Sequence, residues 1–288
     1  MIPPSFRDMP RWWRDGTRWL DALPGLVRAG CDRWRLTVAG EAMHGSNALV
    51  VPVTRDGDEF VLRLSPPGPD VGRQAAALRF WDGRGTARLI DVHDEDGAML
   101  LERLRPGTSL EDVPAEEAVH VLCTMMRRLA VPGPPDVTGT SEAVARRMGT
   151  MEREWVQLGR PFPDRLLREA LDIGVRLSED RSGYAVDGDL HSGQVLRAGR
   201  EDWLVVDPVL LRGEIDYDLG RVLWTRLDDM ATPADIVRHF DVAVTAAGTE
   251  RDRSRDWVVF RTADYWLWGL SAGLTEDPQR CARLSGAL

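Results

Sequence analysis

Hydrophobic and polar residues alternate along the first third of the chain with the period of β-strands. The segments WRLTVAG, ALVVPVTRDGDEFVLRLS and ARLIDVHDEDGAMLLERL contain short alternating runs rich in Val, Ile and Leu. The Asp56-Gly57 pair and the DEDG segment predict tight turns within the last two of them. VGRQAAALRFW, which lies between these segments, is predicted to be a short helix. The order β-β-β-α-β-β predicts a five-stranded antiparallel sheet with one helix over residues 1–104.

The spacing of apolar residues changes to a helical period after the turn-forming segment RPGTS. Apolar positions in 114–130 recur every three or four residues, and further helices are predicted at about 141–159 and 164–180. GQVLRAGREDWLVVD predicts one hairpin, with strands at 194–198 and 203–207, and most of the chain from Asp216 onward is predicted to be helical. Residues 105–288 are therefore expected to form a mostly helical lobe that contains one small hairpin.

Composition limits the classes of protein that fit this pattern. A hydrophobic content of 43% and a charged content of 29% are typical of a globular protein. No apolar run approaches the length of a membrane span, and the arginine- and tryptophan-rich start does not resemble a secretory signal. The three widely separated cysteines predict reduced thiols and a cytoplasmic protein. A net charge of −9 argues against nucleic-acid binding and is compatible with a cationic small-molecule partner, whereas monomer and homodimer both stay open.

The chain contains no lysine, so all 37 of its basic residues are arginine. Chemistry that usually employs lysine must therefore be carried out by arginine or not at all. The planar guanidinium forks onto phosphate oxygens, whereas the lysine ammonium behaves as a point charge.

The segment VDGDLHSGQVL carries residues with the spacing of a phosphoryl-transfer site. Asp189 precedes the amide Gln194 by five positions, and Asp207 ends the strand WLVVD eighteen residues after Asp189. Phosphoryl transfer needs a carboxylate to orient the attacking hydroxyl, and oxygen ligands for the metal that neutralises the phosphates. The predicted hairpin between Asp189 and Asp207 is expected to bring the two carboxylates to one cleft.

The run GDLHSGQVL…WLVVDP…GEIDYDLG resembles the aminoglycoside phosphotransferases, and LPGLVRAGCDRWRLTV, ALVVPV, ALRFWDGRGTARLID and MLLERL resemble the branch that contains streptomycin 6-kinases and hydroxyurea phosphotransferases. The resemblance covers roughly residues 12–225. It implies an α+β, protein-kinase-like fold of two lobes, with a nucleotide-binding lobe at 1–104 and a helical lobe with the catalytic loop and the substrate site at 105–288. Asp189 would be the catalytic base, Asp207 the principal Mg²⁺ ligand, and Gln194 the second metal ligand, where the family has Asn.

The same resemblance suggests the residues that bind ATP. Arg63 stands where the family has a strand lysine that contacts the phosphates, and Gln74 stands where a helical glutamate pairs with that lysine. A hydrogen bond between Gln74 and Arg63 is therefore expected. Ser46 lies in the loop expected above the phosphates, and the connection from Glu102 to Leu104 is expected to pair with the adenine base.

Other residues near the motif have less specific interpretations. Asp187 stands where the family often has His, and Asp187 and Glu214 are either contacts for a cationic substrate or solvated carboxylates. Trp266 is a candidate for the substrate wall. His191 is predicted to steady the loop by a hydrogen bond, and Asp218 either to cap a helix or to brace the loop.

The function expected from these residues is ATP- and Mg²⁺-dependent phosphorylation of a hydroxyl on a cationic small-molecule antibiotic, aminoglycoside- or streptomycin-like, or on a related metabolite. The alternative is a catalytically weak or inactive kinase-like protein that binds nucleotide or ligand. The substitutions at Gln74, Asp187 and Gln194 favour this alternative.

Overall fold

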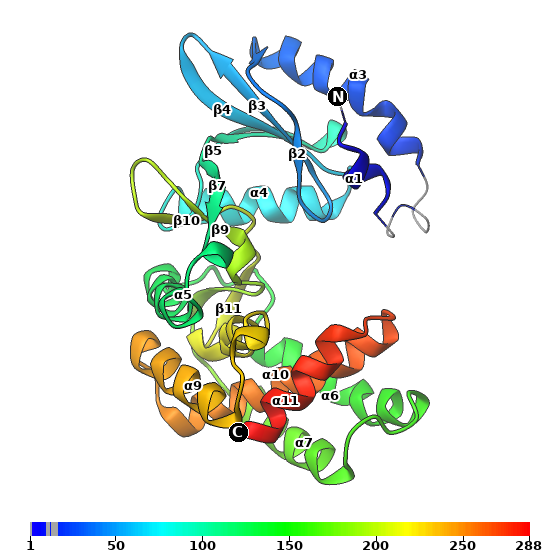
Figure 1. Ribbon diagram of the computed structural model, residues 1–288, viewed down its shortest axis with the longest axis vertical. Coiled ribbons are helices and arrows are strands. Elements are labelled where there is room, and N and C mark those ends of the chain that lie inside the picture. Colours follow the sequence, from blue (N-terminus) through cyan, green and yellow to red (C-terminus); the bar gives the residue numbers. More distant parts are fainter. Residues whose placement is uncertain (1, 10–11, 13–16) are drawn as a thin grey trace. The chain divides into compact units, whose positions relative to one another are not determined.

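The computed structural model describes residues 2–9, 12 and 17–288 (Figure 1). The contacts divide the chain into two compact units. Unit 1 comprises Met1–Pro106 and Arg197–Asp207, and unit 2 comprises Gly107–Leu196 and Pro208–Leu288. The first boundary lies two residues after the expected one, and the segment 197–207, which was assigned to the helical lobe, belongs to unit 1.

In the part of the chain that the structure describes, unit 1 is built on an antiparallel sheet of six strands rather than the expected five. The strand order is β1-β3-β4-β6-β5, and β2 pairs with β3. The strands are β1 (Thr37–Val38), β2 (Met43–His44), β3 (Leu49–Arg55), β4 (Asp58–Leu64), β5 (Leu89–His93) and β6 (Ala98–Glu102). The additional strand is β2, which is too short to show alternation in the sequence.

The turn between β3 and β4 has the backbone that its sequence predicts. Asp56 and Gly57 both have positive φ, at 54° and 92°. Two such residues form the turn whose twist matches that of the flanking strands, and Asp-Gly is a preferred pair there. The turn fixes the register in which Arg63 of β4 lies opposite Val50 of β3.

Two helices cover opposite faces of this sheet, and a short helix, α1 (Pro4–Arg7), precedes them. Helix α3 (Arg18–Trp34) packs Leu20 and Leu23 against one face, and helix α4 (Pro69–Trp81) packs Leu78 against the other. Successive side chains of β4 point to opposite faces of the sheet. Leu62 therefore packs in the hydrophobic cluster that contains α3 residues, and Val61 packs in the cluster that contains α4 residues. Each fully buried leucine contributes about 1.5–3 kcal/mol to stability.

The hairpin predicted within GQVLRAGREDWLVVD is present as β9 (Val195–Arg197) and β10 (Trp203–Val205). Strand β7 (Arg105–Ser109) contains the residue at which the chain leaves unit 1 for the first time. The turn between β9 and β10 belongs to unit 1 and carries Arg200.

Unit 2 is mostly helical, as predicted. Its helices are α5 (Ala115–Leu129), α6 (Thr140–Gln157), α7 (Asp164–Ser178), α8 (Leu219–Trp224), α9 (Pro233–Ala247), α10 (Arg251–Ser271) and α11 (Glu276–Ala287). The main core lies among α6, α7 and α10, where Trp257 and Phe260 are almost fully buried. None of the helices in the described part of the chain is long and apolar enough to cross a bilayer.

A two-stranded sheet in unit 2 was not predicted, and it anchors the motif-bearing loop. Strand β8 (Tyr184–Asp187) pairs antiparallel with β11 (Leu210–Gly213), with Asp187 opposite Leu210. Four residues are too few for a clear alternation pattern, and the two strands lie far apart in the sequence. The segment VDGDLHSGQVL begins in β8, and the chain leaves the strand after Asp187, the last residue of β8.

Candidate active site

The loop that carries Asp189 is anchored at its base by Asp187. Asp187 is 2% exposed, and its Oδ1 accepts hydrogen bonds from the backbone N–H of Asp189 at 3.1 Å and of Val209 at 3.0 Å. Leu190 is fully buried directly after the base. The loop is thus fixed on both sides of Asp189, while 41% of the Asp189 side chain is exposed.

Each carboxylate oxygen of Asp189 is in contact with a donor from unit 2. Gln194 Nε2 donates to Oδ2 at 3.2 Å, and Arg221 Nε lies 2.8 Å from Oδ1. Gln194 is placed by a short 3₁₀ turn, Ser192–Gln194, and by its own N–H, which donates to His191 O at 3.0 Å. Its Oε1 is buried and has no hydrogen-bond partner among the described residues. A buried acceptor of this kind suits a cation, because leaving it without a partner costs about 1–3 kcal/mol.

Opposing effects act on the protonation of Asp189. Burial raises its pKa, and the positive charges of Arg221 and Arg261 oppose that rise. His191 lies two residues after Asp189. Burial, and then the charge of Arg221, lower the pKa of His191 to about 4, so its ring is held neutral. The neutral ring accepts the N–H of Gly193 through Nδ1 at 3.2 Å, which is the loop-steadying bond predicted for it.

Asp218 contacts the loop that carries Asp189, and it is 1% exposed. It accepts a hydrogen bond from the backbone of Leu190 and makes no capping bond to α8, so it braces the loop rather than the helix. Burial raises its pKa well above the ordinary value, and the negative charge of Asp187 raises it further. The two carboxyl groups therefore do not readily carry full charge together.

In unit 1, Arg63 is 6% exposed and is surrounded by oxygen acceptors. Its Nη1 donates to Ser65 Oγ at 3.1 Å, and its Nη2 contacts Asn47 Oδ1 at 3.4 Å and Asp207 Oδ1 at 3.3 Å. The residue proposed to bind phosphate is thus paired with the residue proposed to bind metal. Asp207 lies two residues after the end of β10, and 37% of its side chain is exposed.

The expected hydrogen bond between Gln74 and Arg63 is not formed. Gln74 lies on α4, where its Nε2 is buried without a hydrogen-bond partner among the described residues, while Arg63 pairs with Asp207 instead. The guanidinium of Arg63 contacts the carboxylate of Asp207, which is a stronger partner than the neutral amide of Gln74. Ser46 is exposed in the turn between β2 and β3, which is closed by a bond from Gly45 N to Ala48 O at 3.0 Å.

The expected adenine connection is held by an arginine that sequence reasoning missed. Glu102 ends β6, and its carboxylate pairs with Arg200 Nε at 2.9 Å and accepts the N–H of Arg88 at 3.1 Å. Arg200 also donates to Gly83 O at 2.8 Å. Leu104 is 7% exposed. No local pattern identifies Arg200, because its partners lie far from it in the sequence.

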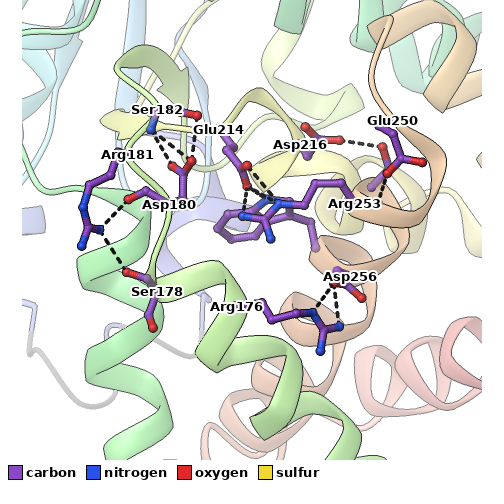
Figure 2. A network of polar contacts seen from close by, with 12 residues as sticks. Arg176, Ser178, Asp180, Arg181, Ser182, Glu214, Asp216, Glu250, Arg253 and Asp256 are labelled. Atoms are coloured by element: carbon purple, nitrogen blue, oxygen red, sulfur yellow. Dashed lines mark hydrogen bonds and ion pairs between the residues drawn. The ribbon is translucent and has the colours of Figure 1, made fainter.

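Glu214 lies at the end of the β8–β11 sheet away from Asp187, directly after the Gly213–Tyr184 pair. Its carboxylate accepts from Arg253 Nε at 2.9 Å and from the indole N–H of Trp257. Figure 2 shows Arg253 reaching Glu214 within a network of polar contacts between α7, α10 and the segment before β8. Glu214 is therefore not grouped with the base.

Trp266 packs inside the helical core. Its ring lies 4.9 Å from that of Phe162, and it is partly buried against the cluster among α6, α7 and α10. The next residue back, Tyr265, contacts Arg221 instead, with the guanidinium 5.6 Å from its ring centroid. No local pattern indicates Arg221 or Tyr265, because the contacts of Arg221 with Asp189 and with Tyr265 depend on how α8 and α10 pack.

Each of the two expected metal ligands has an oxygen atom of the kind that Mg²⁺ binds. Mg²⁺ prefers oxygen ligands and usually binds through one or two carboxylates plus substrate phosphates and water. Asp207 supplies a carboxylate in unit 1, and Gln194 supplies the buried amide oxygen in unit 2. Among the described residues no group of three or more His, Cys, Asp or Glu side chains could form an all-protein cage.

Known proteins resemble this chain over most of its length. Residues 33–273 match the family described as aminoglycoside/hydroxyurea antibiotic resistance kinase. The chain is 34% identical over 281 residues to a streptomycin 6-kinase of Streptomyces glaucescens, covering 95% of this chain and 92% of the relative. It is 34% identical over 270 residues to a hydroxyurea phosphotransferase of Kitasatospora aureofaciens, covering 92% of this chain and 78% of the relative.

Solved structures show the same fold at low identity. Aminoglycoside phosphotransferase APH(4)-Ia, in a ternary complex with ADP and hygromycin B, matches with a TM-score of 0.60 at 16% identity, over 90% of this chain and 96% of that one. Choline kinase LicA from Streptococcus pneumoniae matches with a TM-score of 0.63 at 9% identity, over 92% and 98%. The expected kinase-like α+β fold is confirmed. The chain belongs to the aminoglycoside/hydroxyurea antibiotic resistance kinase family and is a small-molecule phosphotransferase.

Proposed function

We propose that the protein transfers the γ-phosphoryl group of ATP to a hydroxyl of a cationic small-molecule antibiotic, aminoglycoside- or streptomycin-like, or of a related metabolite. The observation that carries the proposal is the pairing of Asp189 with Gln194 in a loop held by Asp187. This pairing orients a carboxylate that is partly open to solvent. Antibiotic phosphotransfer is the activity of the family to which the chain belongs.

In this reaction Asp189 acts as the general base. The acceptor hydroxyl oxygen forms a bond to the γ-phosphorus while the bond from that phosphorus to the β,γ-bridging oxygen breaks. The hydroxyl proton passes to the Asp189 carboxylate and then to water, and the products are ADP and a phosphate ester. Gln194 Nε2 holds Oδ2 of the base, so the carboxylate keeps one orientation during the transfer.

Asp207 and Gln194 Oε1 are the residues that would hold Mg²⁺. The bound ion would neutralise phosphate charge. Arg63 would bind the phosphates through its guanidinium, and Ser46 would contact them from the turn between β2 and β3. The backbone between Glu102 and Leu104 would pair with the adenine base, held in place by Arg200.

The relatives are named for two different acceptors. One relative is named for streptomycin and another for hydroxyurea, at the same identity of 34%, so similarity does not choose between them. Of the acceptor contacts proposed from sequence, Asp187 binds backbone N–H groups, Glu214 binds Arg253, and Trp266 packs against Phe162. We assign Asp187 to support of the loop that carries the base, and Glu214 and Trp266 to contacts within unit 2. A cytoplasmic monomer or homodimer, with no nucleic-acid or membrane partner, completes the proposal.

The test is a screen of the purified protein with ATP and Mg²⁺ against a panel of antibiotics that includes streptomycin, together with hydroxyurea. The readout is the mass gain of one phosphoryl group. Asp189→Asn should abolish the gain, whereas Asp164→Asn, which changes an exposed carboxylate paired with Arg168, should leave it intact. Full activity of Asp189→Asn would refute the assignment of the base.

The ion pair between Arg63 and Asp207 favours a second candidate, a weak or inactive kinase-like protein that binds nucleotide. In such a protein the arginine would compete with the metal for the same carboxylate. Titration of nucleotide with and without Mg²⁺ separates the two functions. Metal-dependent binding with turnover supports the enzyme, and binding that is indifferent to Mg²⁺, without turnover, supports the second candidate.

A further inference from the structure

A stripe of residues along α10 leads from the proposed base to an exposed tryptophan. Arg261, Tyr265 and Trp268 are spaced by four and then three residues, so they lie on one face of the helix. The charge of Arg261 acts on Asp189. The ring of Tyr265 lies beside Arg221, which contacts the same carboxylate at 2.8 Å. Trp268 follows Arg261 by seven residues, or about 10 Å along the helix axis.

Trp268 is the outer ring of a stack of three aromatic side chains. Trp224 of α8 lies 4.5 Å from Tyr265, and Tyr265 lies 5.1 Å from Trp268. The hydroxyl of Tyr265 donates to Asp277 at 2.8 Å, which fixes the middle ring. Trp224 is 1% exposed, whereas Trp268 is 51% exposed. Because Tyr265 covers one face of the outer indole, the surface open to solvent includes its other face.

Trp268 has the exposure that a wall of the acceptor site needs, and Trp266, the tryptophan expected there, does not. Trp266 packs against Phe162 at 4.9 Å, within the helical core. The indole of Trp268 rests on a fixed support, so a ligand that binds to it does not have to order a mobile side chain. Trp268 is therefore the exposed aromatic surface at the end of the stripe that begins at the base.

Carboxylates outnumber guanidiniums in the two charged clusters beside the stack. In one, Arg147 of α6 pairs with two carboxylates, and in the other Arg280 and Arg283 of α11 face three. The carboxylates are Glu154 and Asp264 in the first cluster, and Asp228, Glu276 and Asp277 in the second. At the inner end of the stripe each guanidinium acts on a carboxylate, that of Asp189 or Asp218. These charges attract a cation toward the outer ring of the stack.

The length of the stripe decides which acceptors can contact both of its ends. For proton transfer the reacting hydroxyl oxygen must come within about 2.6–3.2 Å of Asp189. A positive group over the open face of Trp268 then lies on the order of 10 Å from that hydroxyl. The face of an indole is negative and attracts an ammonium or guanidinium group more strongly than other aromatic rings do. An acceptor with a single small ring is too short for both contacts, whereas one built of two or more rings spans them.

We propose that Trp268 is a specificity-determining residue that binds an ammonium or guanidinium group of the acceptor by a cation–π contact, while Asp189 acts on a hydroxyl on the order of 10 Å away. The inference rests on the proposed function and deepens it, because it states which feature of a cationic acceptor the protein recognises and how far that feature lies from the hydroxyl that is phosphorylated.

The test uses streptomycin as a guanidinium probe and kanamycin as an ammonium probe. Their dissociation constants are measured by calorimetry with Mg²⁺ and a non-hydrolysable ATP analogue. Trp268→Leu keeps an apolar side chain but removes the ring, and it should weaken the binding of at least one probe by roughly 3- to 30-fold. Trp268→Phe keeps an aromatic face and should lose less affinity. For a probe that is phosphorylated, KM should rise by the same factor, while kcat and the KM for ATP stay within about twofold of the wild type.

Tyr184→Leu is the matched control, because Tyr184 is also an aromatic residue of unit 2 that is 50% exposed, and it lies at the end of β8 away from Asp187. It should leave both dissociation constants unchanged, and melting temperatures check that each variant is folded. Equal affinities of the wild type and Trp268→Leu for both probes, equal losses in Trp268→Leu and Trp268→Phe, or no binding of either probe to the wild type overturns the proposal. Weaker binding to Trp268→Leu, without phosphorylation of any compound in the antibiotic screen, refutes the kinase function alone. Phosphorylation of a probe whose affinity is unchanged by Trp268→Leu refutes the role of Trp268 alone.

Discussion

The carboxylate of Asp187 holds the backbone of Asp189, because its Oδ1 accepts the N–H of the proposed base at 3.1 Å. The same oxygen accepts the N–H of Val209 at 3.0 Å, just before β11. One acceptor therefore joins the start of the loop to the segment that enters the partner strand.

Asp187→Ala should lower kcat by roughly 10- to 100-fold, since small displacements of a catalytic group are costly. It should also lower the free energy of unfolding by about 1–3 kcal/mol, because two buried N–H groups lose their acceptor. Asp187→Asn keeps an acceptor oxygen and should retain most of the kcat and most of the free energy of unfolding. Steady-state kinetics and urea unfolding measure the two effects. Equal losses in the two variants would mean that the charge matters and the hydrogen bonds do not.

Much of the fold was predictable because its signals are local. Alternation identified the main strands of unit 1, the Asp56-Gly57 pair identified the hairpin turn, and helical spacing identified α5, α6 and α7. The β8–β11 sheet was missed because pairing between four-residue strands this far apart depends on tertiary packing. The segment 197–207, which was expected in the helical lobe, groups with unit 1, where Arg200 pairs with Glu102.

In the candidate site, too, contacts between residues close in the sequence were predictable, and contacts that depend on packing were not. Asp189 and Gln194 lie five positions apart, so their spacing is readable in the sequence, and the structure shows them hydrogen-bonded. Arg221 reaches Asp189 only through the packing of α8, and no motif indicates it. The partner expected for Arg63 was wrong, because a rule about one helix position does not say which acceptor lies closest in the folded chain.

Gln74→Met should leave the KM for ATP within about twofold of the wild type. Gln74 makes no bond to Arg63, and its Nε2 is a buried donor without a partner among the described residues. Replacing it with an apolar side chain of similar length should stabilise the fold by up to about 1–3 kcal/mol. ATP kinetics and urea unfolding provide the test. A tenfold rise in KM would show that Gln74 orients the nucleotide site despite this geometry.

Glu214→Gln should weaken the fold without altering catalysis. The variant loses the ion pair with Arg253, shown in Figure 2, and leaves a partly buried guanidinium without its counter-charge. We expect a loss of about 1–3 kcal/mol in the free energy of unfolding and a kcat/KM within about twofold of the wild type. Glu142→Gln, in an exposed pair with Arg146, is the control and should change neither. An unchanged stability with a higher KM for the acceptor would instead identify Glu214 as a substrate contact.

Gln194→Ala should raise the Mg²⁺ concentration needed for half-maximal activity by roughly 10- to 100-fold. The substitution removes the buried Oε1 and also the Nε2 donor to Asp189. Gln194→Asn tests whether the shorter amide used by the family can reach both partners here. Gln157→Ala, at an exposed position on α6, controls for loss of an amide. An unchanged Mg²⁺ dependence in Gln194→Ala would remove Gln194 from the metal site.

Asp218 should make the stability of the protein depend on pH. Burial, and then the charge of Asp187, raise its pKa in the folded state above the ordinary value of the unfolded chain. A raised carboxyl pKa means that the folded state binds the proton more tightly, so the contribution to stability is complete below the unfolded pKa. It is lost as pH rises toward the folded pKa.

Asp218→Asn cannot ionise, but it keeps an acceptor for the backbone of Leu190. The free energy of unfolding of the variant, relative to that of the wild type, should therefore increase with pH from about pH 4 upward and level off above the folded pKa of Asp218. Urea unfolding over this range measures the difference, with Asp136→Asn, at an exposed turn, as the control for loss of a carboxylate. A difference that stayed flat with pH would show that Asp218 is ionised in the folded protein, and that its negative charge is balanced by the nearby Arg261.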